Sequence, residues 1–200
     1  MTMARQTHPL GLYLHIPFCR SKCAYCDFYS LSGREDRMDA YTAALERHLI
    51  EVAPQAAQHL VDTVYFGGGT PSYLGEKRLV KLLKAVKKHY RIAPHAEITL
   101  EANPDVVTPE NLAGFAAAGV TRISFGVQSA DDAQLRRLGR THTAAAAAQA
   151  FAWAREAGFR EICGDIMLAL PYYSIAEFDK TLALLQAGGC THISAYLLKI

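Results

Sequence analysis

Residues 63–100 read TVYFGGGTPSYLGEKRLVKLLKAVKKHYRIAPHAEITL, and this stretch decides the fold class. Its apolar, β-branched ends predict two strands, at Thr63–Phe66 and Glu97–Leu100. Between them, apolar side chains recur at helical spacing, at Leu79, Leu82, Leu83, Val86 and Tyr90. A strand, a helix and a strand in this order predict a β-α-β unit with parallel strands.

The same alternation continues on both sides of this unit. Further strands are predicted at Leu12–Ile16, Arg122–Gly126, Glu161–Met167 and His192–Leu198, with helical patterns in every gap. The chain therefore reads as six strands joined by helices in an α/β fold. Right-handed crossovers place the carboxyl ends of all parallel strands at one edge of the sheet. From this alternation alone, a doubly wound sheet and a barrel both remain open.

Several helix ends are marked by residues that cap helices. Thr108 and Pro109 predict a helix start, and Gly119 is placed to end that helix. Ser174, followed three residues later by Glu177, predicts a capping box at the start of another helix. Thr143 is placed to cap the alanine-rich helix that follows it.

The composition fits one globular domain over residues 1–200. Half of the residues are hydrophobic and 20% are charged, so one large core is expected. The 21 Lys and Arg residues nearly balance the 19 Asp and Glu residues, and this balance does not favour nucleic acid as a partner. The lysines between Lys77 and Lys88 lie opposite the leucines of their predicted helix without interleaved aromatic residues, which indicates a solvated face.

Five cysteines in 200 residues are too few, and odd in number, for a secreted disulfide scaffold. We therefore expect a reducing, cytoplasmic location, and no signal peptide is predicted. The uncharged run 181–198 contains Gln186, two glycines and His192, which predicts a helix end, a turn and a strand instead of a transmembrane segment. The last predicted strand is followed directly by the chain end, so we expect a chain truncated after strand six.

Three cysteines lie within the segment 19–26, CRSKCAYC, just after the first predicted strand. Cys19, Cys23 and Cys26 can converge on one centre. Zinc would need a fourth ligand, for which His15 is the nearest candidate in the sequence. An iron–sulfur cluster normally takes four thiolates, so three would leave one iron open for chemistry. Unpaired structural thiols are the remaining alternative.

The spacing Cys-x3-Cys-x2-Cys, with Tyr25 before the last cysteine, resembles the signature of the radical S-adenosylmethionine (SAM) superfamily. Two further segments, YLHIPFC at 13–19 and GGGTPS at 67–72, resemble its subgroup of oxygen-independent coproporphyrinogen III oxidases and haem chaperones of the HemW type. The resemblance extends from about Tyr13 to the end of the chain. It implies a parallel (β/α)6 partial barrel of the TIM type. It also implies a [4Fe-4S] cluster on Cys19, Cys23 and Cys26 that binds SAM through its open iron.

The resemblance places SAM contacts at the carboxyl ends of the strands, where the active sites of βα barrels lie. The turn formed by Gly68, Gly69 and Thr70 would bind the SAM amino group, because glycines let the backbone approach a ligand closely. Glu101 suits the SAM ammonium or ribose, and Arg140 could hold a carboxylate by a bidentate pair. The other implied contacts are Tyr13, Tyr25, Gln128 and Asp165.

One loop departs from the pattern of the resembled family. Relatives usually carry Gly-Leu-Pro-Gly-Gln where this chain has ALPYY at 169–173, so both glycines and the glutamine are replaced. Contacts assigned to this loop are therefore open. Cys163 and Cys190 lack cluster spacing and are predicted to be buried thiols.

Phe28 stands where the coproporphyrinogen enzymes usually have a further cysteine, and the Cys-Asp-Phe ending favours the chaperone branch. We therefore expect a chaperone that binds haem and delivers it to acceptor proteins, with a flavodoxin- or ferredoxin-like electron donor. The alternative is SAM-dependent oxidative decarboxylation of coproporphyrinogen III to protoporphyrinogen IX. A non-catalytic zinc-loop domain is the third hypothesis. Family members carry a further C-terminal region, so we expect these 200 residues to hold the cluster and SAM without the full activity.

Overall fold

The computed structural model describes residues 8–198. Its main element is a six-stranded sheet in the order β1-β4-β5-β6-β7-β8, with every neighbouring pair parallel. The strands are β1 (His8–Ile16), β4 (His59–Gly68), β5 (Ile92–Ala102), β6 (Arg122–Gln128), β7 (Glu161–Leu168) and β8 (His192–Leu197). All six predicted strands are confirmed. Three start earlier than predicted: β1 and β4 by four residues, at His8 and His59, and β5 by five residues, at Ile92.

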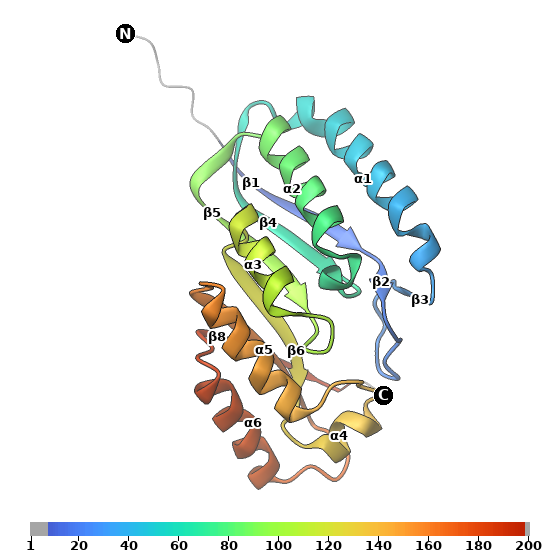
Figure 1. Cartoon of the computed structure of the whole chain (residues 1–200), viewed down its shortest axis with the longest axis vertical. Helices are drawn as coiled ribbons and strands as arrows, with labels where there is room; N and C mark the ends of the chain where they lie inside the picture. The colour runs from blue at the N-terminus through green and yellow to red at the C-terminus, as the bar shows by residue number, and fades with distance from the viewer. Residues whose placement is uncertain (1–7, 199–200) are drawn as a thin grey trace.

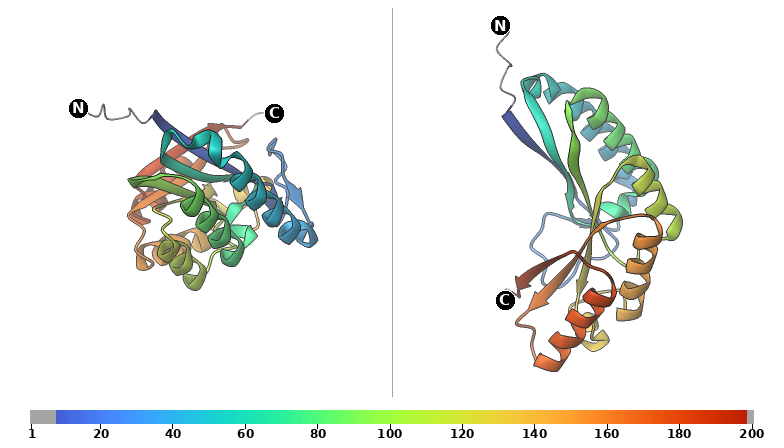
Figure 2. Two further views of the ribbon diagram at one scale, coloured as in Figure 1. Left: turned by 90° about the horizontal axis from the view of Figure 1, so that it is seen from above. Right: turned by 90° about the vertical axis from the view of Figure 1, so that its left-hand side faces the viewer.

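The helices all lie on one face of a curved sheet, and the concave face is free of helices (Figures 1 and 2). The helices are α1 (Met38–Val52), α2 (Glu76–His89), α3 (Pro109–Ala118), α4 (Asp132–Arg137), α5 (Ala144–Glu156) and α6 (Ile175–Ala187). Strands that follow one another in sequence order, joined by crossovers of one hand, place every helix on the same side. A doubly wound sheet would have helices on both faces, so the partial barrel is the correct alternative. In residues 8–198, no helix is both long enough and apolar enough to cross a membrane.

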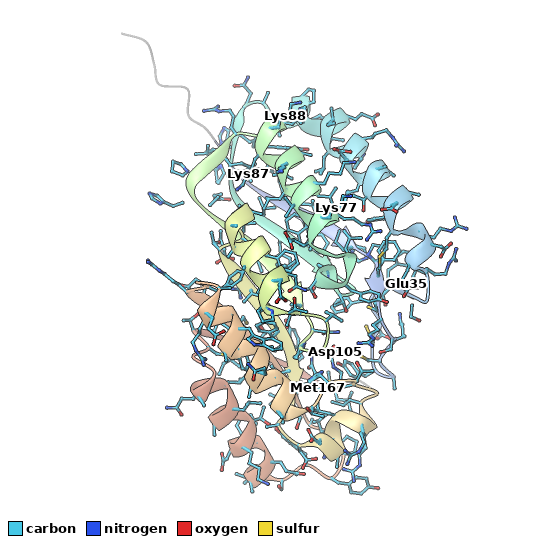
Figure 3. All side chains as sticks on the ribbon, in the orientation of Figure 1. Glu35, Lys77, Lys87, Lys88, Asp105 and Met167 are labelled. Atoms are coloured by element: carbon cyan, nitrogen blue, oxygen red, sulfur yellow. The ribbon has the colours of Figure 1, made fainter. Side chains whose placement is uncertain are left out.

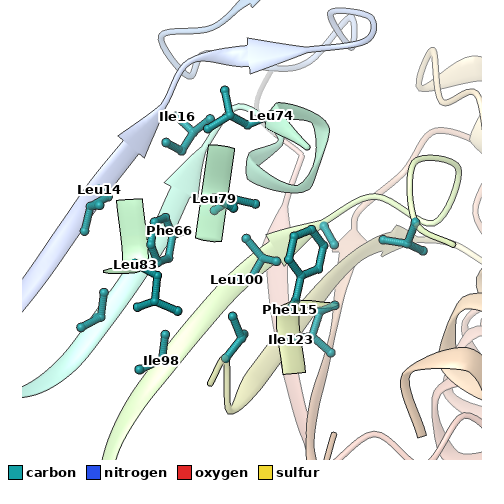
Figure 4. Packing of buried hydrophobic residues seen from close by; sticks show 14 of the residues in the cluster. Leu14, Ile16, Phe66, Leu74, Leu79, Leu83, Ile98, Leu100, Phe115 and Ile123 are labelled. Atoms are coloured by element: carbon teal, nitrogen blue, oxygen red, sulfur yellow. The ribbon is translucent and has the colours of Figure 1, made fainter. Parts of the chain in front are cut away.

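The hydrophobic core fills the space between the sheet and the helices (Figure 4). Leu82 and Val86 of α2 are fully buried, as are Phe66 of β4 and Leu100 of β5. The opposite face of α2 carries exposed lysines, of which Figure 3 labels Lys77, Lys87 and Lys88. The predicted amphipathic helix is therefore confirmed, with its charges at the surface.

The predicted helix ends are confirmed by their hydrogen bonds. The Thr108 hydroxyl accepts from the Asn111 N–H at 3.3 Å, and the Asn111 side chain accepts from the Thr108 N–H at 2.9 Å. Gly119 ends α3 in the left-handed conformation, with φ at 98°. Ser174 and Glu177 form the predicted capping box, and Thr143 caps α5.

A second, two-stranded sheet was not predicted. β2 (Phe18–Cys19) pairs in parallel with β3 (Leu31–Ser32), and the Leu31 N–H donates to the Pro17 carbonyl at 2.6 Å. Two-residue strands are too short to show a periodic pattern. This pairing closes the loop that carries the cysteines and fixes Cys19 next to the carboxyl end of β1.

Candidate metal and cofactor site

The three cysteines of the 19–26 segment lie beyond the carboxyl end of β1. Cys19 ends β2 and is buried, whereas Cys23 and Cys26 are half-buried on the following turn, in which the Cys26 N–H donates to the Cys23 carbonyl at 3.2 Å. Burial raises the pKa of the Cys19 thiol, and the nearby Cys26 and Cys23 thiols raise it further. Hydrogen bonds from Thr70 and Ser30 oppose this rise in pKa. The three thiols therefore share one electrostatic environment.

A continuous line of polar contacts connects Cys19 to Cys23. The Thr70 hydroxyl donates to Cys19 Sγ at 3.6 Å, and Arg140 Nη1 donates to Cys23 Sγ at 3.6 Å. Asn103 joins these two donors: its Nδ2 donates to Thr70 Oγ1 at 3.2 Å, and its Oδ1 accepts from Arg140 Nη2 at 2.7 Å. Two predicted SAM contacts, Thr70 and Arg140, thus touch the predicted cluster ligands directly.

The glycine turn after β4 packs tightly against the cysteine loop. Gly68 has φ at 115°, and a Cβ at this position would lie 2.6 Å from the His15 ring. A Cβ on Gly69 would lie 2.8 Å from the Phe18 carbonyl oxygen and 3.0 Å from Cys19 Sγ. Only glycine fits at both positions, because any side chain would displace the cysteine loop or the β1 strand.

The N–H groups of this turn are already engaged within the protein. Gly69 donates to the Ile16 carbonyl at 2.9 Å, Thr70 donates to the Phe18 carbonyl at 2.8 Å, and Gly68 donates to Glu101 Oε2 at 3.1 Å. An ammonium group needs acceptors and not donors. Backbone carbonyls of the turn are therefore the groups suited to the predicted amino contact.

Two half-buried carboxyl groups face the concave side of the sheet. Glu101 of β5 alternates with Leu100 and Ala102, which lie in the core, and its Oε1 accepts from the Tyr65 hydroxyl at 2.7 Å. Asp165 of β7 accepts from the Ser124 hydroxyl at 3.1 Å. Burial raises the pKa of both carboxyl groups, and the charge of Asp165 raises the pKa of Glu101 further. This polar, half-enclosed face can bind cationic and hydroxyl groups.

Gln128 ends β6 with its side chain buried and its Oε1 without a hydrogen-bond partner among the described residues. Its backbone is left-handed, with φ at 67°. Atoms of Gln128, Arg140 and Asn103 surround Gly126, where a Cβ would lie 3.1–3.2 Å from all three side chains. The unpaired amide oxygen in this crowded group is free to accept a hydrogen bond from a ligand.

The two predicted aromatic contacts lie on different sides of the site. Tyr13 of β1 stacks on Tyr65 with ring centroids 5.9 Å apart. Tyr25 packs against a small apolar cluster that contains Leu138 and Met167. It also lines a pocket of about 480 Å³, together with Ala24, Asp27, Gln134, Arg137, Leu138, Pro171 and Leu198. Tyr25 therefore offers an aromatic surface beside the cysteine loop.

The His15 ring, the nearest candidate for a fourth zinc ligand, contacts Tyr13 and Tyr29 instead of the cysteines. Its Nε2 lies 2.8 Å from the Tyr29 carbonyl, and its Nδ1 lies 3.3 Å from the Tyr13 hydroxyl. In the described part of the chain, no three His, Cys, Asp or Glu side chains form a group that could hold one metal ion. The cysteines of a four-iron cluster each bind a different iron, so they need not meet at one point. Three thiols flanked by hydroxyl and guanidinium donors fit such a cluster.

Comparison with known proteins identifies the family. The profile of the radical SAM superfamily matches residues 13–185. The chain belongs to the radical SAM superfamily. SAM and a [4Fe-4S] cluster are the cofactors that membership in this superfamily implies.

Individual radical SAM relatives are similar over nearly the whole chain. Heme chaperone HemW of Escherichia coli (strain K12) is 40% identical over 194 residues, and heme chaperone HemW of Mycobacterium tuberculosis (strain ATCC 25618 / H37Rv) is 38% identical over 195 residues. Each match covers 96% of this chain, but only 51% and 50% of the relatives. The chain thus spans about half the length of the curated relatives it matches.

The solved structure of coproporphyrinogen III oxidase from Escherichia coli has the same fold. It superposes with a TM-score of 0.89 at 30% identity, over 98% of this chain and 46% of that one. The predicted family resemblance and the predicted partial barrel are both confirmed.

The unusual loop after β7 keeps the backbone shape that glycines would give it. Ala169 and Tyr172 stand where the family resemblance leads us to expect glycine, and both are left-handed, with φ at 57° and 58°. The Arg137 guanidinium lies 5.4 Å from the centre of the Tyr172 ring, and Gln134 Nε2 donates to the Pro171 carbonyl at 3.0 Å. These contacts attach the loop to α4.

Two polar residues of the site were missed. Asn103 follows the end of β5 directly and precedes a proline, which is the signal of a polar side chain at a strand end. Tyr65 lies within a predicted strand, and strand alternation places its side chain on the face opposite Phe66, where it meets Glu101. Of the two remaining cysteines, Cys163 is buried as predicted, but Cys190 is only half-buried, and burial raises the pKa of its thiol to about 12.

Proposed function

We propose that this chain is the radical SAM portion of a cytoplasmic haem chaperone, which binds haem and delivers it to acceptor proteins. The observation that carries this proposal is the 35–40% identity, over 93–96% of the chain, to bacterial relatives named heme chaperone HemW. Phe28 supports it, because this exposed residue occupies the position of a further cysteine in the coproporphyrinogen enzymes.

Cys19, Cys23 and Cys26 would hold three irons of the cluster and leave the fourth iron to SAM. When bound and reduced, the cluster supplies an electron for cleavage of SAM. Arg140 would orient the SAM carboxylate by its charge and by the guanidinium N–H groups that are not bonded to Asn103, Gly126 and Cys23. Electrons would come from a flavodoxin- or ferredoxin-like protein.

The concave face would then bind the remaining parts of SAM. Glu101 and Gln128 are acceptors suited to the ammonium or the ribose hydroxyls, and Asp165 is a third acceptor on the same face. Tyr25 and the pocket beside it offer an apolar surface for the flat adenine ring. The curved sheet keeps Glu101, Gln128 and Asp165 at fixed separations, because each lies on a strand.

The second candidate function is oxidative decarboxylation of coproporphyrinogen III. It is supported by the structural similarity to coproporphyrinogen III oxidase, at a TM-score of 0.89. The two functions share the cluster and SAM, so only the fate of the tetrapyrrole distinguishes them.

A paired assay tests the choice. The anaerobically reconstituted chain is titrated with haem while its Soret absorbance is followed, and a parallel sample receives coproporphyrinogen III, SAM and a reductant. We expect saturable haem binding at one haem per chain, without release of CO2 from the porphyrinogen. Release of CO2 would establish the oxidase instead. Failure to bind haem with an intact cluster would contradict haem binding by this portion of the chaperone.

A further inference from the structure

We propose that Asn103 is a positioning residue that holds hydrogen-bond donors against two of the cluster cysteines and thereby sets the reduction potential of the cluster. The inference rests on the proposed cluster site. Asn103 is half-buried directly after β5, and Pro104 follows it and restricts the backbone of the turn. Its side chain therefore has a fixed point of attachment at the edge of the sheet.

Both the nitrogen and the oxygen of the Asn103 side-chain amide form hydrogen bonds. Its Nδ2 can only donate and does so to Thr70 Oγ1 at 3.2 Å, and its Oδ1 can only accept and does so from Arg140 Nη2 at 2.7 Å. Neither an aspartate nor a leucine can make both contacts. The amide is thus a specific link between Thr70 and Arg140.

The hydrogen bonds to Asn103 orient the N–H and O–H groups of Thr70 and Arg140. Thr70 accepts from Asn103, so its own hydroxyl proton is left for Cys19 Sγ at 3.6 Å. Arg140 Nη2 is held by the Asn103 side chain and by the Gly126 carbonyl at 2.6 Å. The other arm, Nη1, then faces Cys23 Sγ at 3.6 Å.

One amide thus supports donors to two thiolates that would bind different irons. Hydrogen bonds to cluster sulfurs disperse their negative charge and favour the reduced state, so they raise the reduction potential. Asn103 touches neither sulfur itself and acts only through Thr70 and Arg140. Since Arg140 is also the proposed partner of the SAM carboxylate, losing its support should weaken SAM binding as well.

Two variants separate these effects. Asn103→Asp keeps an acceptor for Arg140 but loses the donor, so the Thr70 proton turns to the new carboxylate and away from Cys19. Asn103→Leu has a similar size and loses both contacts. Asn111→Leu is the matched control, because Asn111 is the only other asparagine in the chain and its side chain bonds to Thr108 and to the Val106 carbonyl, and not to Thr70 or Arg140.

The measurement is an anaerobic potentiometric titration of each reconstituted protein, followed by low-temperature EPR, with SAM added in a second series. We expect the potential to be more negative in both Asn103 variants and unchanged in Asn111→Leu. We expect SAM affinity to fall about tenfold in Asn103→Leu and to stay within about threefold of wild type in Asn103→Asp.

Iron and sulfide content and far-UV circular dichroism show which variants fold and hold the cluster. If Asn103→Leu does not fold, the smaller uncharged variant Asn103→Ala, which also loses both contacts, decides, because the charge of Asn103→Asp lowers the potential by itself. A variant that holds the cluster at the wild-type potential would overturn the inference while leaving the cluster site intact. A wild-type chain without a SAM-sensitive cluster would instead overturn the proposed function, and this inference with it.

Discussion

Two turns at the carboxyl edge of the sheet use left-handed backbone in different ways. In the turn after β4, Gly68 has no room for a side chain, because a Cβ would lie 2.6 Å from the His15 ring. In the loop after β7, Ala169 and Tyr172 adopt similar left-handed angles with their side chains exposed. The first turn needs glycine for both conformation and space, whereas the second has space for side chains and holds them in a left-handed backbone.

This difference shows where packing constrains the site. The β4 turn contacts β1 and lies against Cys19, so it cannot move without moving a proposed cluster ligand. The β7 loop is attached to α4 by the Gln134 hydrogen bond and the Arg137 contact, and it can carry side chains at the cost of backbone strain. The side chains of Ala169 and Tyr172 are exposed, so the β7 loop lacks the packing constraint of the β4 turn.

Of the substitutions that compare the two turns, Gly68→Ala is expected to lower the free energy of unfolding most. The added methyl group meets the His15 ring, and the backbone is left-handed, so the free energy of unfolding should fall by about 2–5 kcal/mol. Gly158→Ala is the matched control, because Gly158 has φ at 93° but nothing within 4 Å of its Cβ position. The free energy of unfolding of Gly158→Ala should fall by only about 1–2 kcal/mol. Urea unfolding measures both, and equal losses would show that the β4 turn has room after all.

Asp165→Asn tests the carboxyl group on β7, the strand that leads into the second of the two turns. Burial raises the pKa of Asp165 above its ordinary value of about 3.9. The protonated carboxyl group therefore favours the folded state. This contribution to stability is fully present below about pH 3.9 and is lost as the pH rises through the pKa of the folded state. The uncharged variant should therefore be more stable than wild type at pH 7, on the order of 1 kcal/mol, and the gain should vanish near pH 3.5. Unfolding measured from pH 3.5 to 8 checks this, with the exposed Asp179→Asn as control. If Asp165→Asn is more stable than wild type by the same amount at every pH, the charge of Asp165 is not the cause.

Ala169→Gly is expected to have the smallest effect, in the opposite direction to Gly68→Ala. Removing an exposed methyl group from a left-handed residue relieves strain, and the added freedom of the unfolded chain offsets part of the gain, so stability should rise by about 0.5 kcal/mol. Ala148→Gly, at an exposed position inside α5, should instead lose about 1 kcal/mol. A loss of similar size at both positions would mean that Ala169 is not strained.

The sequence predicted the sheet and its helices because both depend on periodic patterns. Buried strands such as Arg122–Gly126 and the leucine face of α2 bury apolar side chains at regular intervals, which a single sequence reveals. The β2–β3 pair could not be predicted, since two-residue strands have no period. The left-handed angles at Ala169 and Tyr172 were also not predicted, because nothing in those residue types signals that conformation.

The site was predicted less evenly than the fold. The spacing of Cys19, Cys23 and Cys26 by itself predicts a metal cluster. Glycines and charged residues at the carboxyl ends of the predicted strands indicate the edge of the sheet where the site lies. Asn103 depends on two partners, Thr70 and Arg140, that are 33 and 37 residues away in the chain. Only the folded sheet brings the ends of β4 and β5 and the segment after α4 together, so no local pattern could have revealed this link.

The most direct test of the proposed site is low-temperature EPR of the anaerobically reconstituted, dithionite-reduced chain, with and without SAM. Cys23→Ala removes one proposed ligand, and Cys190→Ala is the control for losing a cysteine elsewhere. We predict a [4Fe-4S] signal that changes when SAM is added, persists in Cys190→Ala and is lost in Cys23→Ala. Binding of zinc alone, or a cluster signal that SAM leaves unchanged, would contradict the cluster and SAM site described for the cysteine loop and the β4 turn.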